Sequence, residues 1–267
     1  SDVHDIYEKL FYSSSSEILQ DIPKEIFIAL SDETEKDEGA KVLKTIGFKE
    51  PEKAFEDIGL LKYGPPFAHF PQKTRTILAR ILPFLVSRIV MSPDPDMAIS
   101  NLERFVSRVG ARTVFYSLMA ENKSVMELLI KLFSTSAFLS RTFIEHPEIM
   151  DYLLSREVNK SYKDIEEIKK ELSLALELCE DYEAKLDAMR RFKNTEILRI
   201  GINDVFRELD AVSVSRQVTF LADASLEKAY QIAMEEVSAR YGTPSDKRFA
   251  AVALGKLGGE EITYSSD

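Results

Sequence analysis

The chain has 267 residues, with 35 Lys and Arg against 45 Asp and Glu, so its formal net charge is −10. A hydrophobic content of 45% excludes a disordered or collagen-like chain, and a pI near 5.1 argues against a general nucleic-acid binder. One cysteine, Cys179, and three histidines exclude an internal disulfide and a cysteine–histidine zinc site. We find no signal peptide and no apolar run of the roughly 20 residues that span a bilayer, so we expect a cytoplasmic protein with no membrane partner.

The first half of the chain has helical periodicity, and its low glycine content, 10 in 267, also favours helix. Residues 1–30 predict one or two short amphipathic helices, followed by an acidic connector over 31–40. The segment SPDPD at 92–96 is expected to cap the helix that follows it. Short helices with polar joints continue to His146 and Pro147, where the series ends.

The second half predicts three long helices, at about 182–194, 195–210 and 213–241. The apolar run 249–254 is then too short for a helix and predicts a buried strand, and 262–264 has the β-branched and aromatic character of a second strand. The predicted fold class is therefore mainly α. A helical region at 1–145, which the resemblance described below implies is a linker or regulatory region, precedes, at 146–267, the helices and opening strands of a mixed α/β domain.

Chemistry-bearing residues gather at 254–267, LGKLGGEEITYSSD, which holds three of the chain's ten glycines. The spacing of these glycines fits neither a P-loop nor a dinucleotide-binding fingerprint. Glycines between two strands let the backbone approach a phosphate closely, and a carboxylate at a strand end can hold Mg²⁺, so this layout suits nucleotidyl transfer. A plain glycine hairpin with a terminal aspartate explains the spacing equally well.

The same segment resembles the signature of the glutamine synthetase adenylyltransferase family (glutamate-ammonia-ligase adenylyltransferases), which belongs to the polymerase-β-like nucleotidyltransferases. That family's pattern reads approximately G-K-L-G-G-x-E-L-x-Y-x-S-D-x-D. The residues that match it are Gly255, Lys256, Leu257, Gly258, Gly259, Glu261, Tyr264, Ser266 and Asp267, with Ile262 in place of Leu. Further resemblance to sequences of the family occurs, in the same order along the chain, at 92–122, 129–154, 189–206 and 239–259. The resemblance therefore covers about 42–267.

The resemblance implies an enzyme that transfers AMP from ATP to a tyrosine of glutamine synthetase, under control of the PII signal protein and glutamine. Asp267 would be the catalytic metal ligand, for Mg²⁺. Gly255, Gly258, Gly259 and Ser266 would bind the nucleotide along its phosphates. Lys256 would supply phosphate charge, although a solvated loop lysine is an equal alternative.

The family has a deadenylylating and an adenylylating domain joined by helices, and this chain resembles the joining helices and the opening of the adenylylating domain. The pattern needs a second aspartate two residues after Asp267, because alternate strand residues share a face and can grip one metal. We therefore expect a piece of a longer protein that is inactive alone. The alternatives are a shorter homologue with one transferase domain, a deadenylylating homologue, and a non-catalytic helical interaction module.

Arg190, Arg191, Lys193 and Arg199 form a basic cluster on a predicted helix. Helical spacing places Arg191 and Arg199 roughly on one side, two turns apart. They could face an acidic ligand, but we favour pairing with the abundant carboxylates of the chain.

Overall fold

The computed structural model describes residues 22–64, 70–110, 112–149, 161–243, 245, 249–264 and 266. The chain divides into two compact units, Ser1–Pro147 and Glu148–Asp267. The described residues are mainly α-helical, as the sequence predicts. None of the helices in the described ranges is long and apolar enough to cross a membrane.

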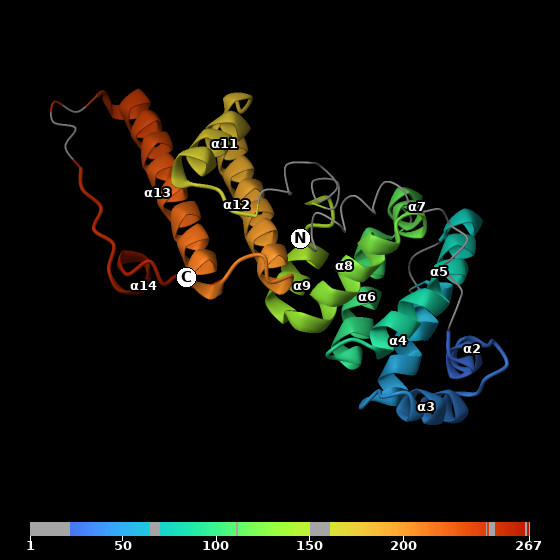
Figure 1. Cartoon of the computed structure of the whole chain (residues 1–267). Helices are drawn as coiled ribbons and strands as arrows, with labels where there is room; N and C mark the ends of the chain where they lie inside the picture. Colours follow the sequence, from blue (N-terminus) through green and yellow to red (C-terminus); the bar gives the residue numbers. More distant parts are fainter. Residues whose placement is uncertain are drawn as a thin grey trace. The chain divides into compact units, whose positions relative to one another are not determined.

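The first unit is a helical bundle in which α6 (Pro95–Val109) packs against four other helices (Figure 1). Its other helices are α2 (Lys24–Leu30), α3 (Lys36–Thr45), α4 (Pro51–Tyr63), α5 (Gln72–Val90), α7 (Thr113–Glu121), α8 (Lys123–Thr135) and α9 (Ala137–Glu145). Capping sets the helix starts: Asp94 accepts from the Met97 amide to begin α6, as predicted, and Ser136 does the same for α9.

Aromatic side chains from three helices form the core of this unit. Phe105 on α6 stacks on Phe143 of α9 with 5.4 Å between ring centroids, and lies 5.7 Å from the ring of Phe133 on α8. All three side chains are fully buried. Ring pairs at these separations add to the stabilisation from burial, so they hold α6, α8 and α9 together.

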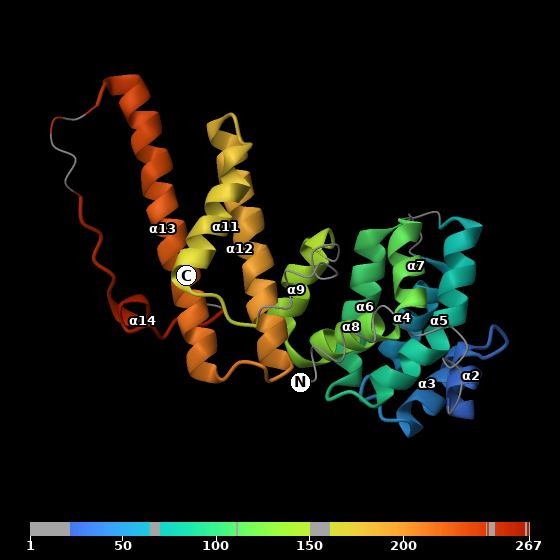
Figure 2. The same cartoon turned by 45° about the horizontal axis from the view of Figure 1, so that its top comes forward.

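In the described part of the second unit, α11 (Ile165–Glu177), α12 (Tyr182–Val205) and α13 (Ala211–Tyr241) form a bundle, and the single turn α14 (Gly255–Gly258) follows. The three long helices lie side by side in both views (Figures 1 and 2). Asp164, Asp181 and Asp210 cap their respective N-termini, and Asp164 forms a full capping box with Glu167.

A buried ionic network ties this bundle together. Glu196 on α12 accepts from Lys163 Nζ at 2.9 Å and from Arg199 Nε at 3.0 Å, and Arg199 also donates to Gln217 of α13 at 2.8 Å. Lys163, Glu196, Arg199 and Gln217 are all at most 2% exposed. Since buried charges are costly unless paired and hydrogen-bonded, the network specifies how the loop before α11 sits on the two long helices.

Three predictions about secondary structure are wrong. The acidic connector predicted over 31–40 is shorter, because α3 already begins at Lys36. The break predicted between 182–194 and 195–210 is absent: α12 runs without interruption from Tyr182 to Val205, and within it the Thr195 hydroxyl donates to the Arg191 carbonyl. The described part of 249–264 contains no strand: 249–254 has no neighbouring strand to pair with, and Gly255–Gly258 forms α14. A strand needs a ladder partner, which no described segment supplies.

Candidate functional site

The glycine-rich segment of the second unit folds into a tight turn, and its geometry requires two of the three glycines. Gly255 has φ +61°, and a Cβ on Gly258 would lie 2.5 Å from the Ala253 carbonyl oxygen. Gly259 has room for a Cβ, since its nearest neighbour would be 3.4 Å away. Two of the three glycines are therefore needed to form the turn itself.

The turn is anchored to the bundle at three points. Ile262 is buried, and the Tyr264 hydroxyl donates to Asp204 Oδ2 of α12 at 3.0 Å. Burial, and then the neighbouring Asp204 carboxylate, raise the pKa of Tyr264 above its usual value, so the phenol stays protonated and keeps donating. Arg216 on α13 lies 3.6 Å from Glu260. These contacts fix the turn against α12 and α13.

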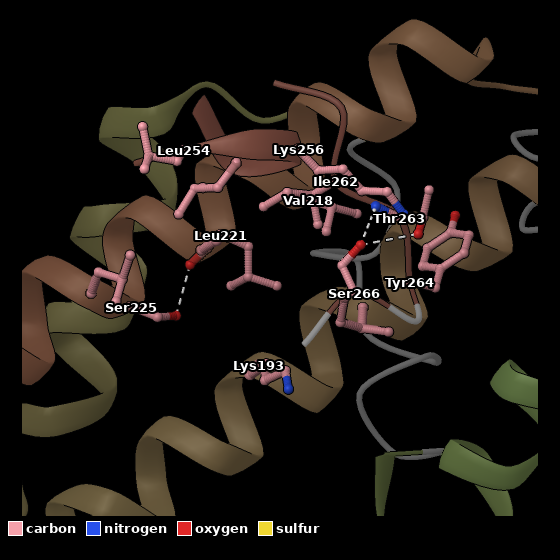
Figure 3. Close-up of a pocket in the computed structure, with 14 residues that line it drawn as sticks. Lys193, Val218, Leu221, Ser225, Leu254, Lys256, Ile262, Thr263, Tyr264 and Ser266 are labelled. Atoms are coloured by element: carbon pink, nitrogen blue, oxygen red, sulfur yellow. Dashed lines mark hydrogen bonds between the residues drawn. The ribbon is translucent and has the colours of Figure 1, made fainter. Parts of the chain in front are cut away.

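A cavity of about 720 Å³ lies between the turn, α12 and α13 (Figure 3). Its apolar walls come from the bundle and from the turn. The apolar lining residues are Ile197, Val218, Leu221, Ala222, Leu226, Leu254, Leu257 and Ile262. The polar ones are Lys193, Ser225, Lys256, Thr263, Tyr264 and Ser266. Concave apolar walls with a few converging polar groups are typical of small-molecule sites.

The charge in this cavity is positive. Lys193 on α12 and Lys256 on α14 both line it and are solvent-exposed, and neither has an ion pair within the described residues. In Figure 3 the two lysines lie on opposite sides of the cavity. The two ammonium groups therefore make the lining of the cavity favourable for an anionic ligand.

Most of the predicted site residues lie in the turn or line the cavity. Gly255, Gly258 and Gly259 form the turn, and Lys256 and Ser266 line the cavity. The Ser266 hydroxyl accepts from the Thr263 amide at 3.1 Å, so within the turn it has a structural role. Asp267, the predicted metal ligand, lies outside the described residues. The part of the chain that the structure describes contains no group of three or more His, Cys, Asp or Glu that could hold a metal ion.

The residues of the basic cluster at 190–199 lie in different environments. Arg199 is fully buried and pairs with Glu196, and Arg190 pairs with Asp187 at 2.6 Å, so pairing with carboxylates is confirmed for both. Arg191 is exposed, so it does not share the environment of Arg199 despite the spacing. Lys193 alone of the four lines the cavity.

Sequence reasoning missed the cavity walls supplied by α13, such as Val218, Leu221 and Ser225. It also missed the partners of Arg199. A charged Glu196 three residues before Arg199, within the apolar run around Ile197, was the available signal, because charged residues on the apolar face of a helix must find partners.

The fold and site thus define a helix-rich chain whose second bundle carries a glycine-rich turn beside a cationic cavity. The profile of the glutamate-ammonia ligase adenylyltransferase family matches residues 126–267. The chain is 30% identical over 236 residues, 85% of its length, to a protein of Thioalkalivibrio sulfidiphilus named bifunctional glutamine synthetase adenylyltransferase/adenylyl-removing enzyme. Proteins of the same name from Mannheimia haemolytica and Mannheimia succiniciproducens are also 30% identical, each over 72% of the chain.

The chain therefore belongs to the glutamate-ammonia ligase adenylyltransferase family. It spans about a quarter of the length of the relatives, from 20% to 24%.

Proposed function

We propose that this chain is part of an enzyme that transfers an adenylyl group from ATP to a tyrosine hydroxyl of glutamine synthetase, in the cytoplasm. Family membership supports the reaction class, and the names of the relatives supply the protein substrate. The same names include an adenylyl-removing activity, so removal of AMP from glutamine synthetase is the second candidate for the part represented here.

The observation that carries the proposal is the glycine-rich turn beside the cationic cavity. The turn brings Lys256 and Ser266 to the same cavity as Lys193 of α12. In adenylyl transfer the tyrosine oxygen bonds to the α-phosphorus of ATP as the bond to pyrophosphate breaks. The two lysines would hold phosphate charge, and the apolar walls would receive the base of the nucleotide.

A divalent cation belongs to the proposal on chemical grounds. Phosphoryl and nucleotidyl transfer rely on a metal ion to neutralise the developing charge, and Mg²⁺ prefers carboxylate oxygens together with substrate phosphates. Asp267 is the proposed ligand, with Ser266 next to it. Regulation by the PII signal protein and by glutamine stays a prediction that rests on the family resemblance alone.

The test is adenylylation of glutamine synthetase by the gene product that contains these residues, with ATP and Mg²⁺, followed by intact mass. We expect Lys256→Ala and Lys193→Ala to raise the KM for ATP by roughly tenfold each, about what loss of one charge-assisted contact costs. Lys170→Ala, which removes an exposed lysine of α11 outside the cavity, is the matched control. Unmodified glutamine synthetase, or cavity variants that behave like the control, would contradict the proposal.

The adenylyl-removing alternative has its own readout. Glutamine synthetase that already carries AMP is incubated with the same gene product, and loss of the AMP mass is followed. If the cavity variants impair removal and leave transfer unchanged, this turn belongs to the removing activity.

A further inference from the structure

The first unit contains a second cavity, of about 420 Å³, where α4, α6 and α9 meet. Four cationic side chains line it from different elements: Lys49 just before α4, Lys53 on α4, Arg104 on α6 and Arg141 on α9. We propose that this cavity binds a small oxyanion, the carboxylate or phosphate group of a metabolite. The site uses none of the residues of the glycine-rich turn and stands apart from the proposed transfer reaction.

Acidic side chains also line the cavity, and two of them are already engaged. Both oxygens of the Asp96 carboxylate accept backbone amides, from Lys49 and from Glu50, each at 2.9 Å. Asp94 accepts from the amide of Met97 at 3.0 Å. The third acid, Glu50, is exposed. The three acids offset part of the positive charge of the lining, and the four cationic side chains leave it with a net positive charge.

Few described groups bind the cationic side chains of this cavity. Arg104 and Arg141 are exposed and have no ion pair among the described residues, and Lys53 donates to the hydroxyl of Ser100 at 3.1 Å. Guanidinium groups favour planar, two-oxygen partners such as carboxylate and phosphate. Two arginines from separate helices at one cavity therefore favour such an anion over chloride.

Backbone dipoles add to the positive potential. The cavity is lined by Glu50 and Lys53 at the start of α4, Asp94 and Met97 at the start of α6, and Ala137, the first residue of α9. Helix N-termini carry partial positive charge and point amides outward. The amides of Lys49 and Glu50 are already bound by Asp96, so a ligand anion would pair with the cationic side chains and not with these two amides.

The test is a titration of the ¹⁵N-labelled chain with inorganic phosphate and, separately, with succinate, each against sodium chloride at equal ionic strength. We expect saturable shifts at the amides of Ala137, Met97 and Lys53. Saturation by phosphate alone would assign a phosphate-bearing ligand, and saturation by succinate alone a carboxylate. Saturation by phosphate, by succinate or by both anions supports an oxyanion site.

Arg104→Gln and Arg141→Gln should each weaken binding about tenfold, the effect of one lost charge-assisted contact. Arg104→Lys should weaken anion binding less, because lysine keeps the positive charge and loses only the paired donors of the guanidinium group. Arg80→Gln, an exposed position on α5 outside the cavity, is the matched control and should bind as the parent does. The proposal is overturned if neither anion gives saturable shifts at these amides, or if both arginine variants titrate like the control.

Discussion

Asp57 on α4 is a buried carboxyl, 7% exposed, whose Oδ2 has no hydrogen-bond partner among the described residues. Burial raises its pKa to about 6; the neighbouring Lys53 opposes that shift, and Glu103 and Glu56 add to it. Between the ordinary pKa of 3.8 and the raised pKa of about 6, the folded state therefore holds a proton on Asp57 that the unfolded state has released.

We expect Asp57→Asn to stabilise the protein at pH 7.5 by about 1–2 kcal/mol, since it removes a charge that folding must desolvate. The parent should lose stability as pH rises from about 4 to 6, the window between the unfolded and folded pKa values, and the variant should not. Urea unfolding followed by circular dichroism measures this, as the chain has no tryptophan. A parent whose stability is flat across that window would contradict the assignment.

Gly258 and Gly259 are adjacent but should respond differently to a methyl group. Gly258→Ala places a Cβ 2.5 Å from the Ala253 carbonyl oxygen, so the turn must shift, whereas Gly259→Ala meets its nearest atom at 3.4 Å. We expect faster hydrogen exchange at the Glu261 amide, which bonds to the Lys256 carbonyl at 2.8 Å, in the Gly258 variant. Equal exchange in both variants would show that the close approach is absent in solution.

At the scale of the helix, α12 shows how one element can serve both core and cavity. Ile197 contributes to the apolar wall of the cavity, while Glu196 and Arg199 point into the ionic network of the bundle. Neighbouring positions on a helix face different directions, so the same two turns supply both surfaces. Disturbing the network should therefore loosen the cavity wall as well.

Glu196→Ala should destabilise the second unit by roughly 3–5 kcal/mol, because it leaves Lys163 and Arg199 buried without their shared carboxylate. Glu171→Ala is the control: it removes a carboxylate that also pairs with Lys163, at 2.5 Å, but whose side chain is 41% exposed. We expect a cost under about 1 kcal/mol there. Urea unfolding followed by circular dichroism measures the free energy of unfolding of both variants. Similar losses of stability would argue that the ionic network is not the main interaction that stabilises the bundle.

At the scale of the whole molecule, the segment 249–254 of the second unit is exposed and outside any helix. Phe249, Val252 and Leu254 are 66%, 81% and 81% exposed, and none of the described amides of this segment donates a backbone hydrogen bond. The ring of Phe249 stacks on Tyr230 of α13, with the ring centroids 4.5 Å apart.

Brief chymotrypsin treatment should cut after Phe249 before it cuts within α12 or α13, because proteolysis requires an unprotected, extended backbone. Intact mass of the early fragments identifies the site. Tyr230→Ala, which removes the stacking partner, should speed that cut several-fold and leave cleavage inside the helices unchanged. Early cleavage within α12 instead would show that the bundle is the weaker part.

From the sequence alone we predicted the helical class, the capped start of α6 within 92–96 and, through the motif at 254–267, the family. These features are local: periodicity, capping and motif spacing lie within a few residues of one another. The prediction of a strand at 249–254 failed for the same reason, since local composition indicates strand character but pairing requires a neighbour elsewhere in the chain.

Only the tertiary structure decided what Arg199 and Lys193 do. Both belong to one basic cluster in sequence, yet Arg199 is fully buried beside Glu196 and Gln217 while Lys193 lines the cavity. Likewise, the cavity with Lys53, Arg104 and Arg141 joins helices far apart in the chain. Charge in sequence shows how many ionic groups exist, and only packing decides which are paired with one another and which remain available to a ligand.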